Sequence, residues 1–197
     1  GVLGSGPKPL CKSISVRSAA DEISSALEGP RRLLVCIYGY QFAQQNSRMN
    51  LFEELYDAYN DEAVILFFSW PDGERIQIKK FKKNVRRELW DANESGKLLG
   101  RFLGSLLREI RLNDGGSAKT HLLVQSFGHH VLNGFLSAVD CDQDRLFDNV
   151  FLFAGDFPVD GLGRTVRLPA VDYNQNDVNI NCDLSGLPQC TSGNIFV

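Results

Sequence analysis

The chain has 197 residues, of which 43% are hydrophobic and 23% charged, and its formal net charge is −3. This size suits one compact domain with a substantial core, and so small a net charge gives no electrostatic reason to expect nucleic acid or a membrane surface as a partner. No apolar run reaches about 18 residues, so no membrane span is expected. The N-terminus lacks the layout of a signal peptide. We expect no metal and no cofactor.

The five cysteines are an odd number without the spacing of a zinc site. Cys36 stands inside an apolar run, where a reduced and buried thiol is expected. A reducing cytoplasm is therefore the predicted location.

In chain order, residues 1–17 begin with a stretch rich in Gly and Pro and are predicted to form a flexible arm. A short helix is expected from Ser18 to Leu27, ended by Gly29 and Pro30. The continuous apolar run that follows, Arg31–Tyr38, suits a strand buried on both faces. Three similar runs and a weaker fifth, broken by Pro169, are predicted strands: Ala63–Phe68, His121–Val124, Val150–Phe153 and Thr165–Tyr173.

Between these runs, apolar residues recur at helical spacing over 51–59, 98–110 and 131–139. Gly100 and Gly104 lie one turn apart on the longest of these helices and would allow close packing. Strands that alternate with helices predict an α/β fold, with a mostly parallel sheet and helices on both faces. The domain is expected to span 18–185 and to be followed by an irregular tail, 186–197.

The sharpest local motif surrounds Ser126, which stands between a predicted buried strand and an amphipathic helix, with Gly128 two residues later. This is the layout of a nucleophile elbow, although Val124 replaces the usual first glycine. Such a turn lifts the hydroxyl above the sheet edge, where the helix N-terminus and the next backbone N–H stabilise developing negative charge. The alternative interpretation is a serine that caps the helix and does no chemistry.

Three other segments are candidates for a functional role, two of them after predicted strands and one as a run of basic residues. Gly39 and Tyr40 end the first strong strand, where hydrolases of this topology supply a second oxyanion-hole N–H, although an ordinary loop glycine would look the same. Residues 69–73 indicate a turn in which Trp70 either lines a pocket or simply packs. The basic run from Lys79 to Arg87 predicts a solvated helix face.

Two carboxylates follow later predicted strands, Asp156 and Asp177, and either is suited to orient a histidine in a catalytic triad. The chain has three histidines, and none follows His130. His129 and His130 share the helix with the serine and are expected to point away from its hydroxyl. His121 opens the strand at the opposite end.

Taken in order, these pieces resemble the α/β-hydrolase superfamily, and more closely a branch of small, mostly bacterial α/β-hydrolases without an assigned function. The matching segments are Ile37–Tyr40, Ser69–Gly73, Asp91–Gly96, His121–His129, Val150–Asp156, Arg167–Pro169 and Tyr173–Asp177. The resemblance implies that Ser126 is the nucleophile and that the backbones of Phe127 and Tyr40 form the oxyanion hole. It favours Asp177 over Asp156 as the acid.

The chain also departs from that branch. Tyr38 replaces a loop histidine, and Gln125 replaces the histidine before the serine. The triad histidine belongs in a loop after one further strand, and the chain has no histidine there, so the C-terminal strand and helix of the fold are expected to be missing. Two functions follow. One is a serine hydrolase of the esterase or acyl-transfer type, acting on a small ester-like substrate and impaired by the missing histidine. The alternative is a non-catalytic domain of the same fold that binds an unknown ligand or partner.

Overall fold

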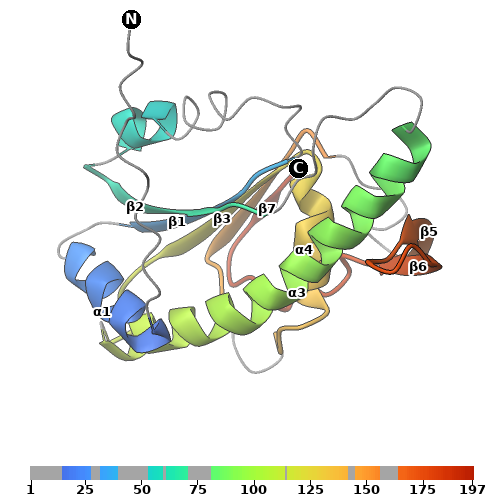
Figure 1. The fold of residues 1–197 in the computed structure, drawn as a ribbon. Coiled ribbons are helices and arrows are strands. Elements are labelled where there is room, and N and C mark those ends of the chain that lie inside the picture. Colours follow the sequence, from blue (N-terminus) through green and yellow to red (C-terminus); the bar gives the residue numbers. More distant parts are fainter. Residues whose placement is uncertain are drawn as a thin grey trace, which may run out of the picture.

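The computed structural model describes residues 15–27, 32–39, 53–59, 61–70, 81–113, 115–141, 145–155 and 164–197. Its centre is a five-stranded sheet, parallel throughout, in the spatial order β2-β1-β3-β4-β7 (Figure 1). The strands are β1 (Arg32–Ile37), β2 (Ala63–Phe68), β3 (Thr120–Gln125), β4 (Asn149–Phe153) and β7 (Ile195–Phe196). The predicted α/β fold is confirmed, and so are the four strands predicted from the strong apolar runs.

Helices cover both faces of the sheet. Three of them lie on one face, below the sheet in Figure 1: α1 (Val16–Ala26), α3 (Phe81–Asn113) and α4 (Gly128–Leu136). Residues 53–59 form a helix on the opposite face. Ser15 caps α1, because its hydroxyl oxygen accepts the Ser18 N–H at 3.1 Å. A helix is confirmed within each predicted stripe where the structure describes it, although α4 ends at Leu136, before the end of the 131–139 stripe, and residues 51–52 lie outside the described residues. Helix α3 extends well beyond the apolar stripe that predicts it.

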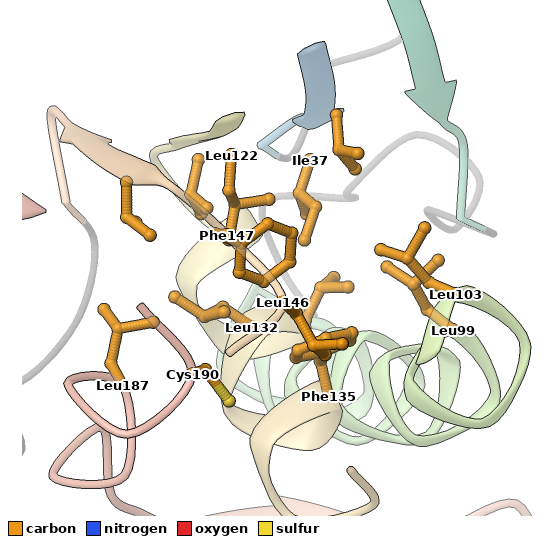
Figure 2. Close-up of a cluster of buried hydrophobic side chains, with 14 of the residues drawn as sticks. Ile37, Leu99, Leu103, Leu122, Leu132, Phe135, Leu146, Phe147, Leu187 and Cys190 are labelled. Atoms are coloured by element: carbon orange, nitrogen blue, oxygen red, sulfur yellow. The ribbon is translucent and has the colours of Figure 1, made fainter. Parts of the chain in front are cut away.

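The core lies between the sheet and the helices α3 and α4. Alternate side chains of β1 and β3 point into it, as expected for strands with a period of two. Figure 2 shows this cluster; its labelled members are Ile37, Leu99, Leu103, Leu122, Leu132, Phe135, Leu146, Phe147, Leu187 and Cys190. Because each fully buried Leu, Ile or Phe contributes about 1.5–3 kcal/mol, this layer holds α4 rigidly against the sheet.

Helices α3 and α4 approach each other through glycines. A Cβ at Gly100 would lie 2.8 Å from the carbonyl oxygen of Phe135, so the close packing predicted for Gly100 is confirmed. Gly104 faces only an ordinary van der Waals contact. Two glycines that the sequence did not single out, Gly96 and Gly134, are more tightly enclosed, because a Cβ on either would overlap a backbone oxygen of the facing helix. This contact fixes the helix that begins next to Ser126.

The predicted fifth strand is wrong in its placement. Strand β5 (Val166–Val171) leaves the parallel sheet and pairs antiparallel with β6 (Asp177–Cys182) in a separate hairpin packed on α3. Pro169 has no N–H to donate, so it fits an edge strand, and both strands of a two-stranded sheet are edges. Asp172 closes the turn by accepting the Asn176 backbone N–H at 2.8 Å.

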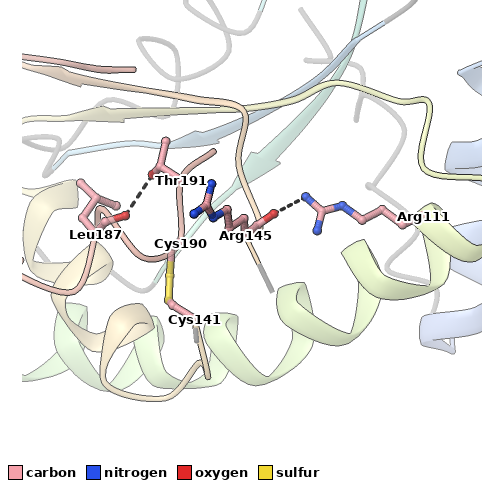
Figure 3. Close-up of a disulfide and its surroundings, with 6 residues drawn as sticks. All are labelled: Arg111, Cys141, Arg145, Leu187, Cys190 and Thr191. Atoms are coloured by element: carbon pink, nitrogen blue, oxygen red, sulfur yellow. Dashed lines mark hydrogen bonds between the residues drawn. A yellow bond between two sulfur atoms is a disulfide. The ribbon is translucent and has the colours of Figure 1, made fainter. Parts of the chain in front are cut away.

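Residues 186–197 also differ from the predicted irregular tail. Ile195 and Phe196 form β7 and pair with β4, so the tail supplies the fifth strand of the sheet. Figure 3 shows Cys190 joined to Cys141 by a disulfide, beside a hydrogen bond from the Thr191 hydroxyl to the carbonyl oxygen of Leu187. The disulfide is unexpected for a reducing cytoplasm, where such bonds are rare.

Two other cysteines are free and buried, Cys36 and Cys182. The prediction for Cys36 is therefore confirmed. Burial raises the pKa of the Cys36 thiol to about 12 and that of Cys182 to about 11. Within the described ranges, no helix has both the length and the apolar character needed to cross a membrane.

Candidate active site

Ser126 occupies a strained turn at the carboxyl end of β3. Its φ of 49° lies in the left-handed region, which costs a non-glycine residue about 1–3 kcal/mol. Its N–H donates to the carbonyl oxygen of Phe153 at 3.0 Å, and its own carbonyl accepts the His129 N–H at 3.1 Å. Helix α4 is preceded by Phe127 in the cap position and has no side-chain cap. The helix-cap interpretation of Ser126 is therefore wrong, and its local geometry is that of an elbow.

Two glycines let the backbone close around this serine. A Cβ at Gly39 would lie 2.7 Å from the Ser126 Cβ and 3.1 Å from the Phe127 backbone nitrogen. A Cβ at Gly128 would lie 2.8 Å from the carbonyl oxygen of Ile37. The end of β1 and the start of α4 thus touch at the elbow, and a side chain would not fit at either glycine. Tyr40, the predicted second oxyanion donor, lies outside the described residues.

An aromatic group lies beside the elbow. The indole N–H of Trp70 donates to the carbonyl oxygen of Tyr38 at 2.9 Å. Its ring stacks on that of Phe127, with centroids 5.9 Å apart and planes 16° from parallel. The ring of His130 packs against Phe127 at 4.7 Å. Trp70, Phe127 and His130 are all buried. The sequence placed Trp70 in a turn but gave no sign of these partners.

The remaining two histidines have other partners. His129 is buried, with its Nδ1 2.6 Å from the carbonyl oxygen of Ser126 and its ring against Gly155. His121 lies at the opposite end of β3, where its Nδ1 is 3.2 Å from the Asn149 amide nitrogen. The Ser126 hydroxyl makes no hydrogen bond with any residue that the structure describes, which includes all three histidines.

The two candidate acids are separated by the fold. Asp177 begins β6 in the hairpin, where its exposed carboxylate is 2.9 Å from the Arg86 guanidinium on α3. The strand before it is not part of the parallel sheet, so the topological reason for preferring Asp177 does not hold. Asp156 lies outside the described residues, and in the sequence it follows β4, the neighbour of β3 in the sheet.

A cavity of about 640 Å³ lies at the other, amino-terminal edge of the strands. Its polar lining includes His121, Lys119 and Asp148, and Ser126 does not line it. Asp148 accepts hydrogen bonds from the Lys119 ammonium at 2.9 Å and the Thr120 N–H at 2.8 Å. Burial raises the pKa of Asp148, but these two donors and the charges of Lys119 and His121 outweigh it and hold the pKa below its usual value.

The pKa of His121 is also below its usual value, but the main cause is different. Burial lowers the pKa of His121, with the charge of Asp148 opposing the shift and the charges of Arg32 and Lys119 adding to it. Because Lys119 and Asp148 are far apart in the sequence, no local motif indicates this cluster.

Comparison with known proteins identifies the family of this chain. No curated protein matches the chain. A protein family described as alpha/beta hydrolase of unknown function matches residues 16–180, which include α1, the first four strands of the parallel sheet and the elbow at Ser126. With most of its length matched and with the parallel sheet that the fold requires, the chain belongs to this family of alpha/beta hydrolases of unknown function.

Proposed function

We propose that the protein is a serine hydrolase of the ester or acyl-transfer class, with Ser126 as its nucleophile. The observation that carries this proposal is the left-handed backbone of Ser126 between two glycines, Gly39 and Gly128. No described contact of the Ser126 side chain offsets the cost of this strained backbone, because the serine neither caps the helix nor forms a hydrogen bond through its hydroxyl. A hydroxyl without a structural partner is free to approach a substrate, although attack also requires an acceptor for its proton.

In the proposed reaction, the Ser126 Oγ attacks the carbonyl carbon of a small ester. The negatively charged oxygen of the tetrahedral intermediate accepts hydrogen bonds from the backbone N–H groups of Phe127 and Tyr40, and the dipole at the N-terminus of α4 stabilises the same charge. The intermediate then expels the alcohol and leaves an acyl-serine, which water hydrolyses.

The proton of the Ser126 hydroxyl passes to water in this proposal, and water returns a proton to the departing alkoxide, so that the alcohol leaves. His129 and His130 are engaged with the elbow backbone and with Phe127, and His121 lies at the far end of β3. Asp177, which the sequence resemblance favours as the acid, is paired with Arg86. An oxyanion hole and substrate binding without a base still accelerate such reactions about 10³-fold to 10⁴-fold over water. We therefore expect slow turnover, with Ser126 still able to form a covalent adduct with a strong electrophile.

The engagement of the three histidines favours one alternative. The chain would then be a non-catalytic hydrolase-fold domain that binds a ligand or a partner at the same edge of the sheet. The two functions differ in whether Ser126 forms a covalent bond with an electrophile.

A fluorophosphonate probe tests this difference. The folded protein is incubated with the probe from pH 6 to pH 9, and the adduct is located by intact mass and peptide mapping. We expect one adduct on Ser126, which Ser126→Ala abolishes. Ser105→Ala is the matched control, because Ser105 is an exposed serine on α3 whose hydroxyl donates to the backbone of its own helix. Absence of labelling at every pH would favour the binding alternative.

A further inference from the structure

We infer that His129 is a positioning residue, whose imidazole fixes and polarises the peptide group between Ser126 and Phe127. The inference rests on the proposed function, because it concerns the same site. It gives a role to a histidine that the proposed reaction does not use as a base. His129 lies in the first turn of α4 and is only 3% exposed.

The peptide group between Ser126 and Phe127 carries the proposed donor to the oxyanion. Its carbonyl belongs to Ser126, and its N–H belongs to Phe127. A trans peptide is planar, so its C=O and its N–H point in opposite directions and cannot turn independently of each other. Among the described residues there is no cis peptide bond. A contact that fixes the Ser126 carbonyl therefore also fixes the direction of the Phe127 N–H.

His129 makes two contacts with that carbonyl. Its backbone N–H donates to the Ser126 carbonyl oxygen at 3.1 Å, and its Nδ1 lies 2.6 Å from the same oxygen. Because a carbonyl oxygen only accepts, Nδ1 must carry a proton, and the two lone pairs of the oxygen accommodate both donors. The backbone bond is open to almost any residue at this position of the helix. The bond from Nδ1 depends on the side chain.

The turn after β4 holds the imidazole from its other side. A Cβ on Gly155 would lie 3.2 Å from the ring Nε2 and 3.4 Å from Cε1, so the ring has little room to move in that direction. The chain reaches Gly155 through Ala154, whose φ of 46° is left-handed like the 49° of Ser126. Strained residues of this kind persist where the surroundings hold them, and they cluster at active sites. The ring thus lies between two strained turns at the ends of neighbouring strands.

The bond from Nδ1 acts on the proposed reaction in two ways. Oxyanion donors must lie about 2.7–3.1 Å from the developing charge, so a peptide that rotates freely would stabilise that charge less. Hydrogen bonds to the carbonyl also polarise the peptide and strengthen its N–H as a donor, by about 10–30% for each bond. Neither effect requires His129 to touch the substrate or to accept the proton of the serine.

Two substitutions of His129 separate the donor at Nδ1 from the rest of the side chain. His129→Asn keeps an N–H donor at the position of Nδ1, because the amide nitrogen of Asn stands the same number of bonds from the backbone. His129→Gln moves that nitrogen one bond farther out. The matched control is His121→Gln, the same substitution at the opposite end of β3. Each variant is compared with the unmodified protein for the second-order rate of fluorophosphonate labelling and for kcat and KM with p-nitrophenyl acetate.

We expect His129→Gln to label about tenfold more slowly, from the loss of one hydrogen bond, with a lower kcat and little change in KM. His129→Asn should label at close to the unmodified rate, and so should His121→Gln. Full-rate labelling of His129→Gln would overturn the inference. Equal slowing of His129→Asn and His129→Gln would also overturn it, because the donor at Nδ1 would then make no difference. In both cases the role of Ser126 stands.

A measurement on the unmodified protein decides the matter if a variant does not fold. The histidines are labelled with ¹⁵N, and long-range proton–nitrogen correlation spectra at pH 8, where an ordinary imidazole is neutral, show which ring nitrogen carries the proton. We expect the Nδ1–H tautomer for His129, and the Nε2–H tautomer would overturn the inference. A protein that shows the Nδ1–H tautomer but never labels at Ser126 leaves the positioning of the peptide intact and overturns the proposed function alone.

Discussion

Replacement of Gly39 by alanine tests the geometry of the candidate site most directly. The added methyl group would lie 2.7 Å from the Ser126 Cβ, 3.0 Å from the Gln125 carbonyl oxygen and 3.1 Å from the Phe127 backbone nitrogen. The first distance is roughly 1 Å shorter than the optimal separation of two carbon atoms. Two of the three partners are backbone atoms that cannot rotate away. The loop after β1 must therefore retreat from the elbow.

The size of the effect follows from that displacement. Overpacking of this kind costs about 1–3 kcal/mol of the free energy of unfolding. For a chain of this length, each 1 kcal/mol lowers the thermal midpoint by about 2–4 °C. A shift of about 1 Å between the loop and Ser126 should also slow the labelling of the serine roughly 100-fold. The rate is thus far more sensitive than the stability.

Both quantities are measured on the same samples. Labelling is followed as a time course with a fluorescent fluorophosphonate, and the thermal midpoint is read by calorimetry. Gly104→Ala is the matched control, because a Cβ at Gly104 meets only an ordinary contact. If Gly39→Ala labels at the unmodified rate and melts at the unmodified temperature, the loop does not pack on the elbow, and the reasoning about the site fails.

Three further outcomes are expected. Gly134→Ala should lower the free energy of unfolding by about 1–3 kcal/mol in urea titrations, because its Cβ would overlap the Asn93 carbonyl oxygen, and an unchanged urea midpoint would contradict this contact. Because the pKa of His121 is lowered in the folded protein, the unfolded chain binds a proton at this side chain more readily, and the free energy of unfolding should fall as the pH drops below the usual pKa of 6.5. His121→Gln should weaken this pH dependence, and parallel pH profiles of the variant and the unmodified protein would contradict the prediction. Asp177→Asn should cost less than about 1 kcal/mol, because the ion pair is exposed, and should leave labelling of Ser126 unchanged; a large loss of labelling would restore Asp177 as the acid.

Local sequence patterns were sufficient to predict most of the fold. Apolar runs predicted four of the five parallel strands, and helical spacing predicted the helices that cover them, because burial on one or both faces of an element leaves a periodic trace. The candidate elbow at Ser126 was also visible locally, since a strand, a serine, a glycine two residues later and a helix stand close together in the sequence. Gly100 was predicted to allow close packing, and it does so against α4.

The tertiary structure decided what depends on partners that are distant in the chain. It moved Thr165–Tyr173 out of the parallel sheet, turned two residues of the tail into β7, and joined Cys141 to Cys190 across 49 residues. It also overturned the helix-cap interpretation of Ser126 and brought Trp70 against both sides of the elbow. No periodic pattern encodes such contacts, because each depends on where the packed core places two segments. The sequence by itself therefore determined most of the elements and the turn in which the candidate nucleophile stands, whereas only the packing of those elements decided which side chains surround it.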